Sequence, residues 1–216
     1  TVASSPSPAP ANPVTPATVI ARDDFSRDRP DLWEPRDGQW KHENGRLIQS
    51  VIGPVRTALR LRTAPPVDFE VRLKYVPTGG EMWKSVGVNF DVNGKGQEVL
   101  AYLSSVEAGQ KAQVAFKPAG ADYSYPGEGA QGRTVALQQP HELVLRVRGT
   151  LVNLIVDGDP SVAYRLPHDR APGLMELITY DAAAEFLSFE LLTLPSSVSM
   201  AEGMNSVPPS MALTPV

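Results

Sequence analysis

The stretch Glu142-Leu-Val-Leu-Arg-Val-Arg-Gly-Thr-Leu-Val-Asn-Leu-Ile-Val-Asp-Gly158 determines the fold class. Leucine and valine occupy every second position from Leu143 to Val147, which is the period of a β-strand with one buried face. Gly149-Thr150 then turns the chain, and residues 151–156 form a second apolar run. Asp157-Gly158 favours the positive φ values of a tight hairpin turn. The stretch therefore predicts two consecutive antiparallel strands, followed by another turn.

Similar runs continue through residues 20–194, separated by turns rich in Gly, Pro, Asn and Asp. The expected strands are 46–51, 55–61, 69–76, 86–92, 98–104, 112–117, 133–137, 143–148, 151–156, 162–166, 174–180 and 186–194. No segment has a convincing apolar stripe of helical period. About a dozen short strands with almost no helix predict an all-β protein, and their number favours a two-sheet antiparallel jelly-roll sandwich.

Composition divides the 216-residue chain into three parts. Residues 1–19 contain five prolines and no charged or aromatic side chain, which predicts a Pro-rich linker. Residues 195–216 contain four prolines, one charge and no aromatic residue, which predicts a flexible tail. All fifteen aromatic residues lie between these ends, so 20–194 is the expected folded unit. Linkers on both sides indicate one module of a longer polypeptide.

Charge and cysteine content exclude several classes of function. The chain has 20 Lys and Arg against 24 Asp and Glu, with no basic block, so nucleic acid is not an expected partner. No apolar run approaches the roughly 20 residues needed to span a bilayer. The absence of cysteine excludes disulfides, thiolate zinc sites, covalently attached haem and a cysteine nucleophile. Because the chain starts at Thr1, we expect a processed form or an excised piece, from which any export signal is already gone.

Motifs of catalysis are scarce. There is no G-x-S-x-G elbow, the three histidines stand apart, and the G-x-G-x-x-G at 127–132 lacks a following helix. The E-x-D-x-x-E motif of laminarinase-type glycosidases is also absent. Asn89 and Asp91 share a predicted strand face, and Glu98 lies across a predicted hairpin, which would bring acids within a few ångströms of each other, as acid–base work on sugars requires. Asp91 and Glu98 fit equally well as solvated hairpin residues.

A structural calcium ion stays open as a possibility. Asp23-Asp24, Asp91-x-Asn93 and Asp157-x-Asp159 offer oxygen ligands, although none has the length of an EF-hand loop. No other metal and no organic cofactor is indicated.

Aromatic side chains outside the expected core are the best binding candidates. Trp83 lies beside Gly79-Gly80, Tyr123 and Tyr125 lie in a loop rich in Gly and Pro, and Tyr102 shares a strand face with Glu98. Exposed Trp and Tyr stack on sugar rings, and Asn89, Asp91 and Glu98 would bind the hydroxyls. The alternative is that these aromatics cover an edge of the sandwich. The remaining aromatics at strand positions are expected in the core, namely Phe25, Trp40, Phe69, Phe90, Phe186 and Phe189.

The chain also resembles a known family. The motifs that carry the resemblance are Asp23-Asp-Phe25, Trp33, Gly38-Gln-Trp40, Asn44-Gly-Arg-Leu47, Asp68-Phe-Glu70, Val86-Gly-Val-Asn-Phe90, Glu142–Gly149, Val156-Asp-Gly158, Pro172-Gly-Leu174 and Phe186–Leu191. They are similar to concanavalin A-like, laminin G-like jelly rolls of bacterial type. Stretches 83–91, 99–107 and 177–186 resemble, more narrowly, a module of large planctomycete proteins that also carry cytochrome c-like domains.

This resemblance covers nearly all of 20–194 and neither end. It implies a sandwich of six- or seven-stranded sheets in an exported, extracytoplasmic protein of the periplasm or cell surface that handles polysaccharide. It supplies no catalytic residues, and the haem-attachment motif of the usual neighbouring domains is absent here.

Our leading hypothesis is a non-catalytic carbohydrate-binding module of a larger exported protein. Its ligand would be a polysaccharide or glycan bound on the concave sheet and adjoining loops, and its other partners would be flanking domains of the same polypeptide. The main alternative is a structural or protein-interaction spacer. A glycosidase-like enzyme that uses Asp91 and Glu98 is a third hypothesis.

Overall fold

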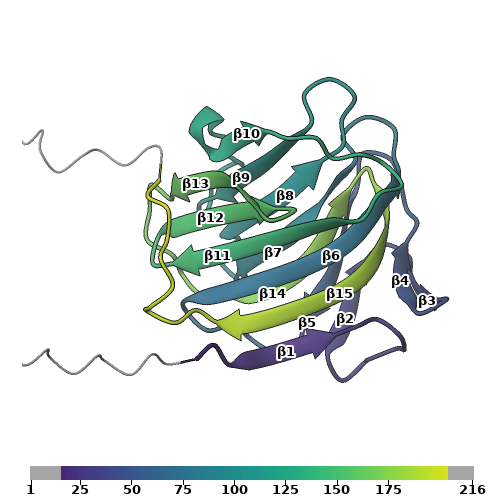
Figure 1. The fold of residues 1–216 in the computed structure, drawn as a ribbon, viewed down its shortest axis with the longest axis horizontal. Helices are drawn as coiled ribbons and strands as arrows, with labels where there is room; N and C mark the ends of the chain where they lie inside the picture. The colour runs from purple at the N-terminus through teal and green to yellow at the C-terminus, as the bar shows by residue number, and fades with distance from the viewer. Residues whose placement is uncertain (1–15, 204–216) are drawn as a thin grey trace, which may run out of the picture.

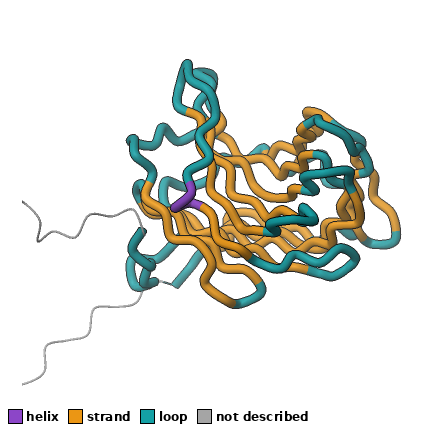
Figure 2. Tube along the Cα trace, turned by 90° about the horizontal axis from the view of Figure 1, so that it is seen from above, coloured by secondary structure: helices purple, strands orange, loops and turns teal. Residues whose placement is uncertain are grey.

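The computed structural model describes residues 16–203, which form two antiparallel sheets packed face to face (Figures 1 and 2). The eight-stranded sheet contains β1 (Val19–Asp23), β3 (Trp40–Glu43), β4 (Arg46–Gln49), β6 (Phe69–Gly79), β11 (His141–Arg148), β12 (Leu151–Val156), β13 (Asp159–Arg165) and β15 (Ala183–Thr193). The seven-stranded sheet contains β2 (Trp33–Asp37), β5 (Arg56–Leu61), β7 (Ser85–Val92), β8 (Glu98–Ser104), β9 (Lys111–Lys117), β10 (Ala130–Gly132) and β14 (Leu174–Tyr180). The all-β jelly-roll prediction is confirmed.

Strand order is non-sequential in both sheets. The first runs β13-β12-β11-β6-β15-β4-β3, with β1 paired to β15 beside β4, and the second runs β10-β9-β8-β7-β14-β5-β2. The only helical segment among residues 16–203 is one 3-10 turn, Gly127–Gly129. Accordingly, no helix in this part of the chain is long and apolar enough to cross a bilayer.

The hairpins predicted from turn residues are present. Residues 143–148 of β11 pair with β12, and the turn from β12 to β13 places Asp157 at φ 52° and Gly158 at φ 86°. Asn93-Gly94 also lies in the turn between β7 and β8, but the positive φ of that turn is at Gly96, at 74°, and not at the predicted pair. In the Asp157-Gly158 turn, positive φ at both central residues matches the right-handed twist of the flanking strands, which is why such residue pairs identify hairpins.

Other strand predictions need correction. The sequence pattern misses β1, β2 and β3, and the sheets have eight and seven strands rather than six or seven. Residues 133–137 form a loop, and the strand nearby is β10, just before them. The Gln110 backbone carbonyl accepts a hydrogen bond from Arg133 N, and its side-chain oxygen accepts one from Val135 N. These bonds to one residue take the place of a strand ladder.

The main core lies between the sheets. Phe25, Phe69, Phe90, Phe186 and Phe189 are fully buried there as expected, whereas Trp40 is only partly buried and packs against the core from its edge. Burying one such side chain contributes about 2–3 kcal/mol to folding.

Residues 195–203, predicted as the start of a flexible tail, pack on the domain. Arg148 donates to the carbonyls of Val198 and Pro195 at 2.8 and 2.6 Å, and Asn153 exchanges two hydrogen bonds with Ala201. This C-terminal segment follows the outer face of the eight-stranded sheet (yellow in Figure 1). The folded part therefore extends past the predicted end at 194, while 1–15 and 204–216 lie outside the described residues.

Candidate functional site

The outer face of the seven-stranded sheet carries a second apolar cluster. Its members are Ala58, Leu100, Tyr102, Ala115 and Ile178, and Tyr123 packs on them from a loop. These residues alternate with core residues along β5, β8, β9 and β14, so these strands are apolar on both faces. Within residues 16–203, no further layer of strands covers this cluster, and it forms the floor of a groove.

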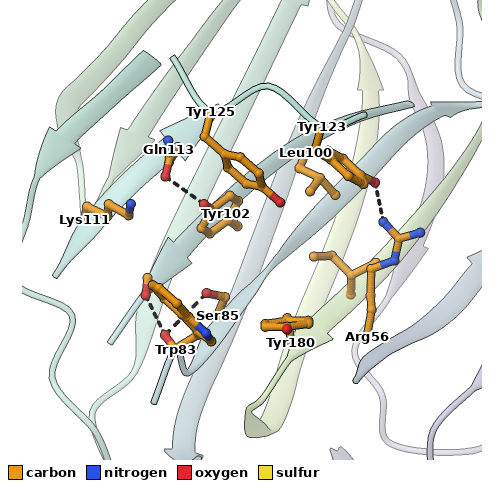
Figure 3. A pocket seen from close by; sticks show the side chains of 12 residues that line it. Arg56, Trp83, Ser85, Leu100, Tyr102, Lys111, Gln113, Tyr123, Tyr125 and Tyr180 are labelled. Atoms are coloured by element: carbon orange, nitrogen blue, oxygen red, sulfur yellow. Dashed lines mark hydrogen bonds between the residues drawn. The ribbon is translucent and has the colours of Figure 1, made fainter. Parts of the chain in front are cut away.

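A groove of about 580 Å³ lies over this floor. This volume is in the range of sites that bind small ligands, roughly 300–1,000 Å³. We call it the aromatic groove, and it is lined by Arg56, Trp83, Ser85, Leu100, Tyr102, Ser104, Lys111, Gln113, Tyr123, Tyr125, Ile178 and Tyr180 (Figure 3).

Aromatic side chains form opposite walls of the groove. Trp83 and Tyr180 lie on one side, and Tyr125 and Tyr123 lie on the other (Figure 3). Trp83 is 46% exposed and Tyr125 is 57% exposed, whereas the rings of Tyr123 and Tyr125 are 5.9 Å apart and tilted by 33°. Large rings that remain open to solvent around a hollow are typical of a binding surface.

Asp181 holds the loop that carries Trp83. Its carboxylate accepts hydrogen bonds from four backbone N–H groups, those of Gly53, Glu81, Met82 and Trp83, at 2.7–3.1 Å. Burial by itself raises the pKa of the Asp181 carboxyl, but the four hydrogen bonds outweigh it and lower this pKa. The charged carboxylate therefore fixes the Trp83 wall from beneath.

Glu98 holds the Tyr123 wall in place, as Asp181 holds the Trp83 loop. It accepts hydrogen bonds from the Tyr123 hydroxyl and, at 2.6 Å, from Asn89 Nδ2, and Arg56 donates to both Glu98 and Tyr123. Burial raises the pKa of Glu98, but the hydrogen bonds from Tyr123 and Asn89 and the charge of Arg56 lower it overall. Burial and the bond to Glu98 together raise the pKa of Tyr123, so its hydroxyl stays protonated.

The floor depends on a close approach of two strands. Gly87 on β7 pairs with Tyr102 on β8, and a Cβ atom at Gly87 would lie 2.2 Å from the Ala101 carbonyl oxygen and 2.7 Å from Tyr102 Cβ. Only glycine at position 87 therefore lets β7 and β8 approach this closely at Tyr102. Its hydroxyl donates to Gln113 Oε1 at 2.7 Å, which ties the floor to β9.

The structure brings four of the seven predicted site residues together, since Trp83, Tyr102, Tyr123 and Tyr125 all line the groove. Glu98 and Asn89 are buried behind the Tyr123 wall and support it, so we do not expect them to bind hydroxyls directly. Asp91 is not part of the groove. It is fully buried, and its carboxylate makes two hydrogen bonds to Arg170, at 2.7 and 2.8 Å.

This placement removes the physical basis for the Asp91–Glu98 acid pair. Asp91 sits at φ 56° beside a register shift between β7 and β14, so the alternation that would put it on the face of Asn89 is broken there. A different acid, Glu176, lies 3.5 Å from Asn89 Nδ2, across from Glu98, and is paired with Arg60. A proton donor needs a raised pKa, whereas the pKa of Glu98 is lowered.

Arg56, Lys111 and Tyr180 are groove residues that the sequence did not identify. Tyr180 shares a strand face with Ile178, and Lys111 shares one with Gln113, so the period of two contained a signal. The signal was ambiguous because both faces of these strands are apolar, and the pattern does not tell which face is outside.

The candidate calcium ligands are engaged by the protein itself. Asp23 accepts hydrogen bonds from Phe25 N and from Trp33 Nε1, at 2.9 and 2.7 Å. Asp91 is held by Arg170, and Asp157 is bonded to His141 and Glu142 N. Within residues 16–203, no group of three or more His, Asp or Glu is arranged to hold a metal ion.

Comparison with known proteins identifies the fold. No protein-family model matches the chain, and no curated protein matches it significantly. Among solved structures, the carbohydrate-binding module CBM66 from Bacillus subtilis is similar with a TM-score of 0.60 at 14% identity, over 71% of this chain and 91% of that one. The fold is a concanavalin A-like jelly roll.

Two further jelly rolls show how widely this fold is shared. A Bacillus subtilis protein with a galectin-like fold has a TM-score of 0.63 at 13% identity, covering 80% of this chain and 94% of its own. Bacillus licheniformis β-glucanase has a TM-score of 0.61 at 12% identity, covering 81% and 97%. Binding modules and enzymes thus share this concanavalin A-like architecture, and identities this low establish the fold alone.

Proposed function

We propose that this chain is a non-catalytic carbohydrate-binding module that binds a glycan in the aromatic groove. The observation that carries the proposal is the pair of exposed rings, Trp83 and Tyr125, on opposite walls above an apolar floor. A sugar ring has apolar C–H faces and a polar rim, so it stacks on aromatic faces while its hydroxyls bond to groups beside them. Gln113 and Lys111 line the groove and offer polar groups for such bonds.

The open groove favours binding over the spacer alternative. A spacer would be expected to fill this hollow with its own side chains, whereas about 580 Å³ is left open between the walls. Similarity to a carbohydrate-binding module adds support of a general kind.

A non-catalytic role is supported by the state of the acids near the groove. Glu98 and Glu176 are each paired with an arginine and lie behind or beside the wall, and Asp91 is paired with Arg170 at a different place. These carboxylates hold the protein together and present no proton donor to the groove.

We further propose that the module is exported and works outside the cytoplasm, joined to other domains. The support is compositional: prolines and small residues dominate 1–19 and 195–216, and polysaccharides occur mainly outside cells. Kinship with the planctomycete modules remains a prediction that rests on the sequence alone.

The test is a glycan array on the full chain, with Trp83→Ala and Met82→Ala as variants. Met82 is a matched control because it is 58% exposed on the same loop but does not line the groove. Loss of the Trp83 ring is expected to weaken binding more than tenfold, as for other stacking anchors, and Met82→Ala should bind like the wild type. Binding to no glycan would overturn the proposal, and binding unchanged by Trp83→Ala would overturn the site.

A further inference from the structure

The aromatic groove has an unbalanced positive charge. Lys111 on β9 lines it, and its ammonium group makes no hydrogen bond or ion pair with any residue between 16 and 203. Arg56 lies at the other side of the groove on β5, and Lys117 lies 5.8 Å from the centroid of the Tyr123 ring. Of the other lysines, Lys41 and Lys74 form ion pairs, whereas Lys95 and Lys117 form none with the described residues, so what sets Lys111 apart is its place in the groove.

Acidic groups near the groove are already neutralised. None of the twelve lining residues is acidic. Glu98, the nearest carboxylate behind the wall, is bonded to Arg56, Asn89 and Tyr123, and Asp181 beneath the Trp83 loop is bonded to four backbone N–H groups. A groove with cationic side chains therefore occurs in a chain whose formal net charge is −4.

We propose, building on the proposed carbohydrate-binding function, that the aromatic groove selects acidic saccharides, in which a uronate carboxylate or a sulfate ester pairs with Lys111. Lys111 is partly exposed and has no counter-charge among the described residues, so an anionic substituent on a bound sugar would form an ion pair without breaking an existing one. Charge-assisted hydrogen bonds to a carboxylate or sulfate are stronger than those to a neutral hydroxyl. The aromatic walls would stack on the sugar ring, and Lys111 would favour a sugar that carries a negative charge.

The experiment compares matched polymers by isothermal titration calorimetry on the full chain. Polygalacturonate is set against its fully methyl-esterified form, and dextran sulfate against dextran, so that carboxylate and sulfate recognition are distinguished. Lys111→Gln removes the charge in the groove, while Lys95→Gln removes one charge from the exposed hairpin between β7 and β8. The second variant measures how much of any effect comes from net charge alone.

The expected result is binding of at least one anionic polymer about tenfold tighter than its neutral partner. Lys111→Gln should abolish that preference, and Lys95→Gln should retain it. Equal binding of neutral and anionic partners, or a preference unchanged in Lys111→Gln, would overturn the inference and leave carbohydrate binding intact. If neither these polymers nor any glycan on the array binds, the proposed function fails together with the inference.

Discussion

The two outer faces of the sandwich are both formed by antiparallel β-strands, but one is charged and the other is apolar and aromatic. On the eight-stranded sheet, Glu70 is clamped by Arg72 and Arg146, and further ion pairs cover the strands around it. On the seven-stranded sheet, Glu98 is clamped by Arg56, yet the surface beside it is apolar and aromatic. A buried glutamate held by arginine therefore does not mark a binding face. The difference lies in the exposed rings that one of the two glutamates supports.

The largest effect is expected at Asp181, which belongs only to the aromatic face. Asp181→Ala leaves four backbone N–H groups without their acceptor and is expected to lower the free energy of unfolding by about 3 kcal/mol. Because these groups hold the Trp83 loop, glycan binding should fall together with stability. Urea denaturation and calorimetry measure the two effects.

Asp157→Ala is the matched control for that loss. Asp157 also has a positive φ and also caps a turn, through His141 and Glu142 N, but it lies between β12 and β13, away from the Trp83 loop. Asp157→Ala should lower the free energy of unfolding without changing glycan affinity, when affinity is measured well below the temperature at which the protein unfolds. Equal loss of binding in the two variants would show that Asp181 has no specific part in positioning Trp83.

The glutamates of the two faces give the second test. Glu70 and Glu98 have side chains 7% and 11% exposed, and each contacts arginines that are partly open to solvent. Glu70→Gln and Glu98→Gln are both expected to destabilise by about 1–2 kcal/mol, less than a fully buried ion pair because solvent screens the arginines. Only Glu98→Gln should weaken glycan binding, because only Glu98 holds an aromatic wall.

The pH dependence of the stability of Glu98→Gln tests whether the charge of Glu98 causes the stabilisation. The pKa of Glu98 is lower in the folded protein than its ordinary value of 4.5, so its charge stabilises the fold above that pH. This contribution is lost as the pH falls below about 4.5 and through the folded-state pKa. The stability difference between wild type and Glu98→Gln should therefore shrink in acid. A difference that stays constant from pH 7 to pH 3 would assign the effect to packing instead.

The sequence predicted the fold well where the pattern is local. Alternation and turn residues from 142 to 158 identify β11, β12 and the hairpin after them without any tertiary information. The candidate groove was predicted in part, because Tyr123 and Tyr125 stand in a loop rich in Gly and Pro where a core role is difficult, and Trp83 stands beside Gly79-Gly80. Asp181 was missed because its partners at 53 and 81–83 are brought to it only by the fold. Asp91 was misplaced because one positive φ breaks the alternation on which the prediction depended.

The smallest effect is expected from Asn153, which belongs only to the charged face. Asn153 makes two hydrogen bonds to Ala201, and Asn153→Ala removes the attachment of the C-terminal segment at that point. The cost is about 1 kcal/mol, because the freed backbone groups of an exposed segment are hydrated again. Hydrogen exchange at the Ala201 amide should accelerate, and glycan affinity should stay at the wild-type value, because the segment lies on the face opposite the aromatic groove. A change in affinity would mean that the two outer faces are coupled through the sandwich. Ligand recognition would then depend on the charged face as well.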